Sequence, residues 1–262
     1  MNCEQRHLAK GRGRLTVLIT AGPTREYLDP VRFLSNDSSG KMGFALAEEF
    51  KKRGARVRLI SGPVNLKPPH DISFHNVVSA QEMFSSVKKY LREADVFIST
   101  AAVSDWRFGR TFPKKMKKNR RTSLSFFMKK NPDILAWAGS WKLGRSHKEA
   151  GDVKEGGVKS PPERQPTLRR SSGDLTPPTL PVLIGFALET GNVKKEALSK
   201  LKKKNLDLII GNTIRTFGSG KIRPRWIERG GKAVPLRKMS KKNLARRICR
   251  WVLRKMAAGK NV

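Results

Sequence analysis

The chain has 262 residues, 37% hydrophobic and 29% charged, a composition typical of a globular protein with one large or two small domains. No run approaches the roughly 20 apolar residues of a membrane span, and the basic first residues lack the apolar segment of a secretory signal. Cys3 and Cys249 lie at opposite ends, and the four histidines show no ligand spacing. This excludes a disulfide framework and a structural zinc site and indicates a reducing, cytoplasmic setting.

The formal net charge is +35, from 56 Lys and Arg against 21 Asp and Glu. Over half of this excess lies from Lys194 onward, where 22 basic residues face three acids. Such a surface binds nucleic acid non-specifically at low salt. No nucleic-acid-binding module or aromatic stacking motif accompanies it, so we expect a polyanionic small-molecule substrate and no specific nucleic-acid or membrane partner.

Strands and helices alternate in the first part of the chain. Apolar, β-branched runs predict strands over 15–21, 56–60, 72–78 and 95–102, and helical periodicity predicts helices over 42–53 and 79–93. Gly54 ends the first helix, and Ser79 with Glu82 forms a capping box for the second. The alternation predicts an α/β fold, a Rossmann-like doubly wound and mostly parallel sheet.

The second part of the chain contains one irregular stretch. Residues 143–180 are rich in Gly, Ser, Pro and charge, so we interpret them as a disordered or surface-loop insertion. Before it we predict a strand over 122–128 and a helix that begins at Asn131 and Pro132, with Asn131 as N-cap. After it we predict a strand (181–186), a Lys-rich helix (193–203), a strand (206–211), a hairpin (225–229 with 233–236) and a helix capped by Ser240. The hairpin is a C-terminal extension of a single domain that comprises residues 15–142 and 181–262 and follows an N-terminal tail, residues 1–14.

The connection between the first strand and the first helix is unusually long. It spans residues 20–43, TAGPTREYLDPVRFLSNDSSGKMG, whereas a βα loop needs about 2–6 residues. A strand, a Gly-Pro turn and a helix start together are typical of a phosphate site, because backbone N–H groups and the helix dipole favour an anion. The candidate phosphate loop comprises Gly22, Thr24, Ser39 and Gly40; an ordinary βα connection is the alternative.

Common nucleotide motifs do not match the sequence. The turn reads Ala21-Gly-Pro-Thr24 instead of Gly-x-Gly-x-x-Gly, and the second predicted strand ends in Ser61-Gly62 instead of an acidic residue. Neither Tyr27 nor Tyr90 is followed by a lysine four residues later, and SSGKMG lacks P-loop spacing. Hydride transfer is therefore disfavoured, and a site that holds a nucleotide beside a second anion remains.

Eight stretches of the chain resemble the bacterial phosphopantothenate–cysteine ligases (phosphopantothenoylcysteine synthetases), in the same order. They are TAGPTREYLDPVRFLSNDSSGKMGFALA, GARVRLISGPV, SAQEM, ADVFISTAAVSDW, KMKK, KNPDIL, GFALET and KKNLDLIIGN. The resemblance implies a ligase of coenzyme A biosynthesis that joins 4′-phosphopantothenate to L-cysteine through an acyl-cytidylate, converting CTP to CMP and pyrophosphate with Mg²⁺. Many members carry an N-terminal flavin-dependent half. Because only 14 residues precede the first predicted strand, we expect a stand-alone ligase without FMN.

The resemblance also implies the site residues. Asn36 would contact the pantothenate carboxylate, Lys115 would be a flap lysine, and Arg32 is the third catalytic candidate. A salt bridge to Asp29 or Glu26 is the alternative for Arg32, and a solvated basic run is the alternative for Lys115. The implied nucleotide-binding residues are Ala101, Ala102, Val103, Asp105, Lys115, Asn131, Pro132, Asp133, Ile134, Phe186, Lys200 and Lys204; no protein metal ligand is implied.

Three positions depart from the family pattern: Pro23, Leu188 and Gly211, the last two where alanine is usual. None of these departures removes a charge or a donor. The choice between CTP and ATP stays open, and so does the oligomeric state. The family usually forms homodimers, and the hairpin at 225–236 is a plausible contact. The competing class is a non-catalytic nucleotide-binding module with a basic surface for RNA or membrane, but Asn36 and Lys115 are both present and favour an enzyme.

Overall fold

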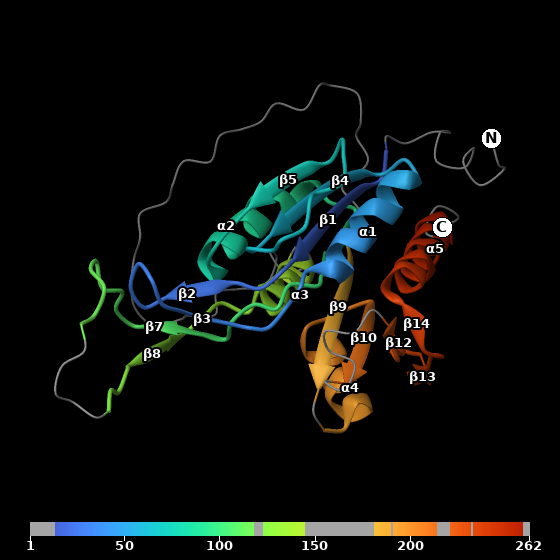
Figure 1. Cartoon of the computed structure of the whole chain (residues 1–262). Coiled ribbons are helices and arrows are strands. Elements are labelled where there is room, and N and C mark those ends of the chain that lie inside the picture. The colour runs from blue at the N-terminus through green and yellow to red at the C-terminus, as the bar shows by residue number, and fades with distance from the viewer. Residues whose placement is uncertain are drawn as a thin grey trace.

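The computed structural model describes residues 14–117, 123–144, 181–189, 191–213, 221–231 and 233–258. Its centre is an eight-stranded sheet (Figure 1). In spatial order the strands are β13 (Ala233–Pro235), β12 (Arg225–Glu228), β10 (Leu208–Thr213), β9 (Val182–Glu189), β6 (Val96–Ser99), β1 (Thr16–Ala21), β4 (Arg56–Ser61) and β5 (Ser73–Asn76).

Six neighbouring strands of this sheet are parallel: β5, β4, β1, β6, β9 and β10. The strands β12 and β13 add an antiparallel hairpin at the β10 edge. Numbered along the chain, the parallel strands run 3-2-1-4-5-6 across the sheet, which is the order of the dinucleotide-binding folds. The predicted Rossmann-like, doubly wound sheet with a C-terminal hairpin extension is therefore confirmed. Successive strands are added on one side of β1 up to β5 and on its other side from β6 onward. At this switch point between β1 and β6 a crevice opens at the carboxyl ends of the strands.

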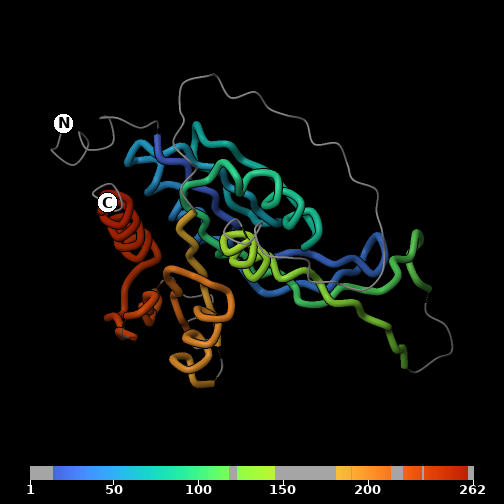
Figure 2. Tube along the Cα trace, turned by 180° about the vertical axis from the view of Figure 1, so that it is seen from behind, coloured from blue at the N-terminus to red at the C-terminus, as the bar shows by residue number. Residues whose placement is uncertain are grey.

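Helices cover both faces of the sheet (Figures 1 and 2). One hydrophobic cluster joins the sheet to α1 (Lys41–Lys52) and α5 (Lys241–Ala258). A second joins its other face to α2 (Ala80–Tyr90), α3 (Ile134–Gly144) and α4 (Val193–Lys203), and a short 3-10 turn (Leu91–Glu93) extends α2. None of the helices in the described ranges combines the length and the hydropathy that crossing a bilayer requires.

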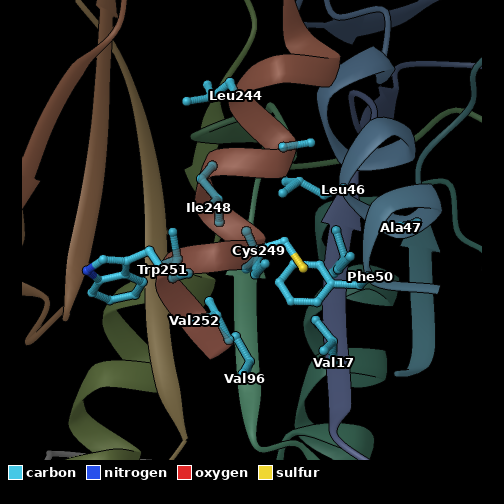
Figure 3. Packing of buried hydrophobic residues seen from close by; sticks show 14 of the residues in the cluster. Val17, Leu46, Ala47, Phe50, Val96, Leu244, Ile248, Cys249, Trp251 and Val252 are labelled. Atoms are coloured by element: carbon cyan, nitrogen blue, oxygen red, sulfur yellow. The ribbon is translucent and has the colours of Figure 1, made fainter. Parts of the chain in front are cut away.

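The packing of α5 on α1 follows directly from the apolar stripe of each helix. Figure 3 shows side chains of α5 meeting those of α1 above β1 and β6; the labelled residues are Leu244, Ile248, Cys249, Trp251, Val252, Leu46, Ala47, Phe50, Val17 and Val96. Full burial of a large apolar side chain such as Phe50 contributes about 1.5–3 kcal/mol. Cys249 is a fully buried core residue, and this burial raises the pKa of its thiol to about 12, so the thiol stays protonated near neutral pH.

Three of the predicted helix signals are confirmed. Ser79 accepts a hydrogen bond from the Glu82 N–H (3.2 Å), and the Glu82 carboxylate accepts one from the Val78 N–H (2.9 Å). Gly54 follows α1 with a φ of 81°. Ser240 caps α5 by accepting from the Asn243 N–H (3.1 Å).

The long connection after β1 contains a hairpin of its own, formed by β2 (Arg25–Tyr27) and β3 (Phe33–Ser35). A second hairpin follows β6 and pairs β7 (Trp106–Phe108) with β8 (Met128–Lys130). The two hairpins lie together and extend beyond the sheet (Figure 1). We call them the β arm, comprising residues 25–35 and the described parts of 106–130.

Three predicted boundaries are wrong. The strand predicted over 122–128 is β8, Met128–Lys130, and residues 123–127 are not strand. The third helix begins at Ile134, and Asp133, whose carboxylate accepts from the Ala136 N–H (3.0 Å), replaces Asn131 at its start. The Asn131 side chain is used in a tertiary hydrogen bond, so it does not cap the helix. The same helix runs to Gly144, two residues into the predicted insertion. The rest of that segment, 145–180, and residues 1–13 lie outside the described ranges.

Candidate active site

A cleft of about 730 Å³ lies at the carboxyl ends of β6, β9 and β10. Ligands of open α/β sheets bind in this crevice, and its volume is in the range of small-molecule sites. Its walls are segments 36–39 and 99–105, the segment 130–135 that leads into α3, the end of β9, and side chains of α4 and α5.

The cleft brings together most of the residues that the sequence singled out, from five separate segments. Its lining includes Asn36, Ser39, Ala101, Ala102, Val103, Asp105, Asn131, Pro132, Asp133, Ile134, Phe186, Lys200 and Lys204. It does not include Gly22, Thr24, Gly40, Arg32 or Lys115.

Asn36 connects the β arm to the loop after β6. Its Nδ2 lies 3.2 Å from the carbonyl oxygen of Ala102 and 3.0 Å from that of Val103. Both donors of the amide are therefore engaged with backbone carbonyls at the cleft wall. The side chain can donate to a ligand in the cleft only by releasing one of these carbonyls, and binding and loop position are coupled through this residue.

Gly22 and Thr24 act on the same loop from outside the cleft. The Thr24 hydroxyl is buried and accepts from the Ser104 N–H (3.0 Å), and the Gly22 carbonyl accepts from the Ala102 N–H (2.9 Å). Gly22 has a φ of 72°, and a Cβ there would lie 3.0 Å from the Gly62 carbonyl oxygen. The geometry thus makes these residues supports of the 99–105 loop.

Asn131 holds the opposite side of that loop. Its side-chain Nδ2 donates to the Ser104 carbonyl (2.9 Å), and its backbone N–H donates to the Asp105 carbonyl (2.8 Å). The Arg107 guanidinium donates to the Asn131 side-chain oxygen (3.0 Å). A buried amide with all these partners fixes the backbone of 104–105 where it faces the cleft.

The two predicted phosphate-binding lysines of α4 each have a carboxylate partner. Lys200 contacts Glu189 at 2.6 Å, and Lys204 contacts Asp133 at 2.6 Å. Burial acts to raise the pKa of Asp133, but the Lys204 ammonium and the N–H groups near the start of α3 outweigh it, so this pKa is lowered. A phosphate that binds these lysines therefore competes with ionised carboxylates.

Two departures from the family pattern, Leu188 and Gly211, lie at or near the apolar wall of the cleft. Phe186 is half-buried and packs against the core beneath α1 and α5, while Leu188 is exposed beside the cleft. At Gly211 an added Cβ would come within 2.7 Å of the Val193 side chain. An alanine at 211 would therefore require the Val193 side chain to shift.

Arg32 and Lys115 lie on the β arm. The Arg32 guanidinium is paired with the buried Asp29 carboxylate and donates to the Met116 carbonyl (3.0 Å). The alternative interpretation of Arg32, a salt bridge with Asp29, is thus the one that the structure shows. Lys115 is exposed in the segment that follows Phe112, whose N–H donates to the Leu28 carbonyl (2.8 Å).

Sequence reasoning assigned no site role to several residues of the lining, among them Lys130, Asn212, Ile222 and Lys241. Asn212 ends β10 and Lys241 begins α5. Neither carries a local motif, and only the adjacency of the strand ends brings them to the cleft. The family stretches include Asn212 and Lys130 but give no role to either.

The carboxylates of the cleft fit a metal that arrives with a nucleotide. Asp37, Asp105 and Asp133 line the cleft, and Asp133 is engaged by Lys204. Among the described residues, no group of three or more His, Cys, Asp or Glu is arranged to hold a metal ion. Mg²⁺ in nucleotide sites uses one or two carboxylates together with substrate phosphates, a role that Asp37 or Asp105 can fill.

Comparison with known proteins identifies the family. A family described as "DNA/pantothenate metabolism flavoprotein C-terminal domain" matches residues 13–148 and 164–256. The chain belongs to this family. The crystal structure of the C-terminal domain of the coenzyme A biosynthesis bifunctional protein CoaBC is similar, with a TM-score of 0.68 and 32% identity over 93% of this chain and 96% of that one. The resemblance inferred from the eight stretches is confirmed at this level.

Relatives of this domain family include two bifunctional CoaBC proteins. That of Haemophilus influenzae is 42% identical over 200 residues, which cover 76% of this chain and 41% of the relative. That of Vibrio vulnificus is 37% identical over 241 residues, which cover 89% and 51%. The chain thus spans about half or less of the length of these relatives. A structure of a Cab2 mutant in complex with phosphopantothenate-cysteine shares the fold, with a TM-score of 0.65 and 17% identity.

Proposed function

We propose that the chain is a phosphopantothenate–cysteine ligase of coenzyme A biosynthesis that works in the cytoplasm. The observation that carries this proposal is the cleft itself: residues from the family stretches converge at the switch point of the sheet. The names of the relatives and the ligand of the Cab2 structure support the same substrate class.

The proposed reaction has two steps. The phosphopantothenate carboxylate attacks the α-phosphorus of CTP, pyrophosphate leaves, and an acyl-cytidylate forms. The amine of cysteine then attacks the acyl carbon, CMP leaves with the bonding electron pair, and the amide loses a proton. Both steps bring anions together, so they need fixed donors and cations in a site that excludes water.

The cleft residues supply these groups. We assign the 101–103 backbone and Asp105 to the base and ribose side, with Phe186 packing on the ring, and Lys200 and Lys204 to the phosphates. Segment 131–134 presents the start of α3, whose N–H groups favour an anion. Asn36 meets the carboxylate and the acyl intermediate. Bound Mg²⁺ would neutralise phosphate charge as the nucleotide reacts.

We assign to the β arm the role of closing over the cleft, with Lys115 as the residue that it brings to the substrates. Lys115 is exposed on the arm and does not line the cleft, so its role requires the arm to approach the cleft when substrates bind. We expect Lys115→Ala to lower turnover at least ~10²-fold, the size of a lost transition-state donor. Lys114→Ala is the matched control, and equal rates for the two variants would contradict the assignment.

We also infer a homodimer. The hairpin of β12 and β13 ends the sheet with an open edge, and Val234 on it is exposed. Light scattering of the wild type and of Val234→Lys tests this: a dimer in the wild type and a monomer in the variant are expected. A dimer in both would exclude the hairpin as the contact.

The test of the proposed function is a pyrophosphate-release assay with phosphopantothenate, cysteine and either CTP or ATP. We expect release that depends on all three substrates and is faster with CTP. A protein that binds nucleotide without turnover, and that binds RNA in a salt-sensitive way, would instead be the non-catalytic module.

A further inference from the structure

A second cavity of about 750 Å³ lies beside the cleft, and one lysine borders both. This cavity is formed by α1, the segment around 66–70 and the start of α5. Lys241 lines the cleft and the second cavity, whereas Lys41 and Lys242 line only the second. Lys241 thus lies between the two cavities.

Lys241 and Lys41 form a pair of like charges. Each is the first residue of its helix, α5 and α1, so the partial positive charge of two helix starts adds to theirs. Within the described ranges, no ion pair includes either lysine. Burial and the charge of Lys41 both lower the pKa of Lys241. Glu48 also lines the second cavity, but its carboxylate is paired with Lys52 (2.6 Å) and not with Lys241 or Lys41.

The other cations of the cleft differ in this respect. Lys200 and Lys204 are each paired with a carboxylate at 2.6 Å. A phosphate that approaches them must replace an existing partner, whereas Lys241 has no carboxylate to release among the described residues. An anion beside Lys241 also relieves its repulsion with Lys41, so the attraction there is larger than for an isolated surface lysine.

We infer that Lys241 is a phosphate-binding residue of the cleft, with Lys41 strengthening the attraction from the second cavity. The identity of its ligand rests on the proposed function: the terminal phosphates of the nucleotide or the phosphate ester of the second substrate. Both sources present a phosphate dianion, and the anion binding itself does not depend on which is correct.

The first experiment measures anion binding by the full chain with pyrophosphate as the probe. Lys241→Met is compared with Lys242→Met, its neighbour that lines only the second cavity, and with Lys241→Arg. We expect Lys241→Met to weaken pyrophosphate binding at least ~10-fold, the loss expected for a charge-assisted hydrogen bond. Lys242→Met should match the wild type, and Lys241→Arg should restore most of the affinity. Equal affinities of Lys241→Met and Lys242→Met would overturn the inference.

The second experiment separates the two phosphate sources by steady-state kinetics. A rise of at least ~10-fold in KM for CTP alone assigns Lys241 to the nucleotide, and a rise for phosphopantothenate alone assigns it to the second substrate. If the wild type shows no turnover but Lys241→Met has lost pyrophosphate binding, the proposed function fails and the inference stands. If turnover occurs and neither KM changes, the inference fails and the proposed function stands.

A structural role for Lys241 is tested by thermal unfolding without ligand. Because the pair with Lys41 is repulsive, Lys241→Met should unfold at the same temperature as the wild type or higher. Pyrophosphate should raise the melting temperature of the wild type more than that of the variant. A marked loss of stability in the unliganded variant would show that the lysine serves the fold, and would overturn the inference.

Discussion

At the scale of single residues, the cleft side chains differ in whether their polar groups are already engaged. Asn36 has both amide donors on the carbonyls of Ala102 and Val103. Lys200 and Lys204 have carboxylate partners. A ligand that binds these three side chains must therefore displace the partners that they already have.

Asn36→Ala should lower turnover at least ~10²-fold, because it removes an uncharged donor and the link between the β arm and the 99–105 loop. Single-turnover measurements with CTP and phosphopantothenate check this, since they isolate the formation of the acyl-cytidylate. Asn76→Ala, at the end of the edge strand β5, is a control with the same chemical change outside the cleft. A near-normal rate in Asn36→Ala would contradict the assigned role.

At the scale of elements, the β arm is held by one buried carboxylate. Asp29 accepts from the Arg32 side chain and from the N–H groups of Val31 (2.9 Å), Arg32 (2.9 Å) and Met116 (3.1 Å). It thus ties the tip of the β2–β3 hairpin to the segment that carries Lys115. The Arg32 guanidinium, more than burial or the N–H donors, determines the pKa of Asp29 and holds it well below the usual range.

The lowered pKa predicts how the arm responds to acid. A carboxylate with a lowered folded-state pKa stabilises the fold above its unfolded pKa, near 3.9. This contribution is lost as pH falls through the folded-state value. The arm should therefore stay ordered at mildly acidic pH, and Asp29→Asn should loosen it wherever Asp29 is ionised in the wild type and remove the pH dependence. Hydrogen exchange of the Arg32 and Met116 amides measures this.

Asp71→Asn is the control for Asp29→Asn, because Asp71 pairs with Lys51 on α1 and not with the arm. In Asp71→Asn the Arg32 and Met116 amides should exchange at the same rate as in the wild type. If the Arg32 and Met116 amides exchange equally fast in both variants, Asp29 does not hold the arm.

The contact between α1 and β1 depends on a glycine. A Cβ at Gly43 would lie 2.5 Å from the Ala21 Cβ and 2.7 Å from the Thr100 hydroxyl oxygen. We expect Gly43→Ala to destabilise the fold by about 1–3 kcal/mol, the range for overpacking. Urea unfolding measures it, with Gly144→Ala, where a Cβ meets nothing within 4 Å, as the control. Equal stability of the two variants would contradict this close packing.

At the scale of the whole molecule, the net charge of +35 acts on every anion, but unequally. A long RNA contacts many exposed lysines, and its binding weakens steeply with salt. A nucleotide bound in the cleft, as proposed, would contact only the few cations there, and Lys204 and Lys241 among them are partly buried, so salt screens them less. The basic surface is thus compatible with selective binding of a small anion.

Raising salt from about 50 to 200 mM should weaken RNA binding by roughly 10³-fold or more, as for a protein with several phosphate contacts. Over the same range the KM for CTP should rise by less than ~10-fold, with kcat nearly unchanged. Fluorescence anisotropy with a labelled RNA and steady-state kinetics check the two parts. Parallel losses of both would indicate that CTP is held by exposed charges and not in the cleft.

The elements of this fold are predictable from the sequence because their signals are local. The Ser79–Glu82 capping box, Gly54 and the Gly230–Gly231 hairpin act over a few residues, and each is found where the pattern predicts it. The alternation of strands and helices likewise indicates a parallel sheet. The family stretches identify most of the cleft lining, because they lie at the ends of these elements.

Only the tertiary structure decides which polar groups meet. Asn131 supports a loop instead of capping a helix, and Lys241 reaches the cleft from the other end of the chain. These outcomes depend on which strand ends are neighbours in the 3-2-1-4-5-6 order. Partners in a hydrogen bond or ion pair are chosen by distance in space, and that distance is determined by the packing of the whole sheet and its helices.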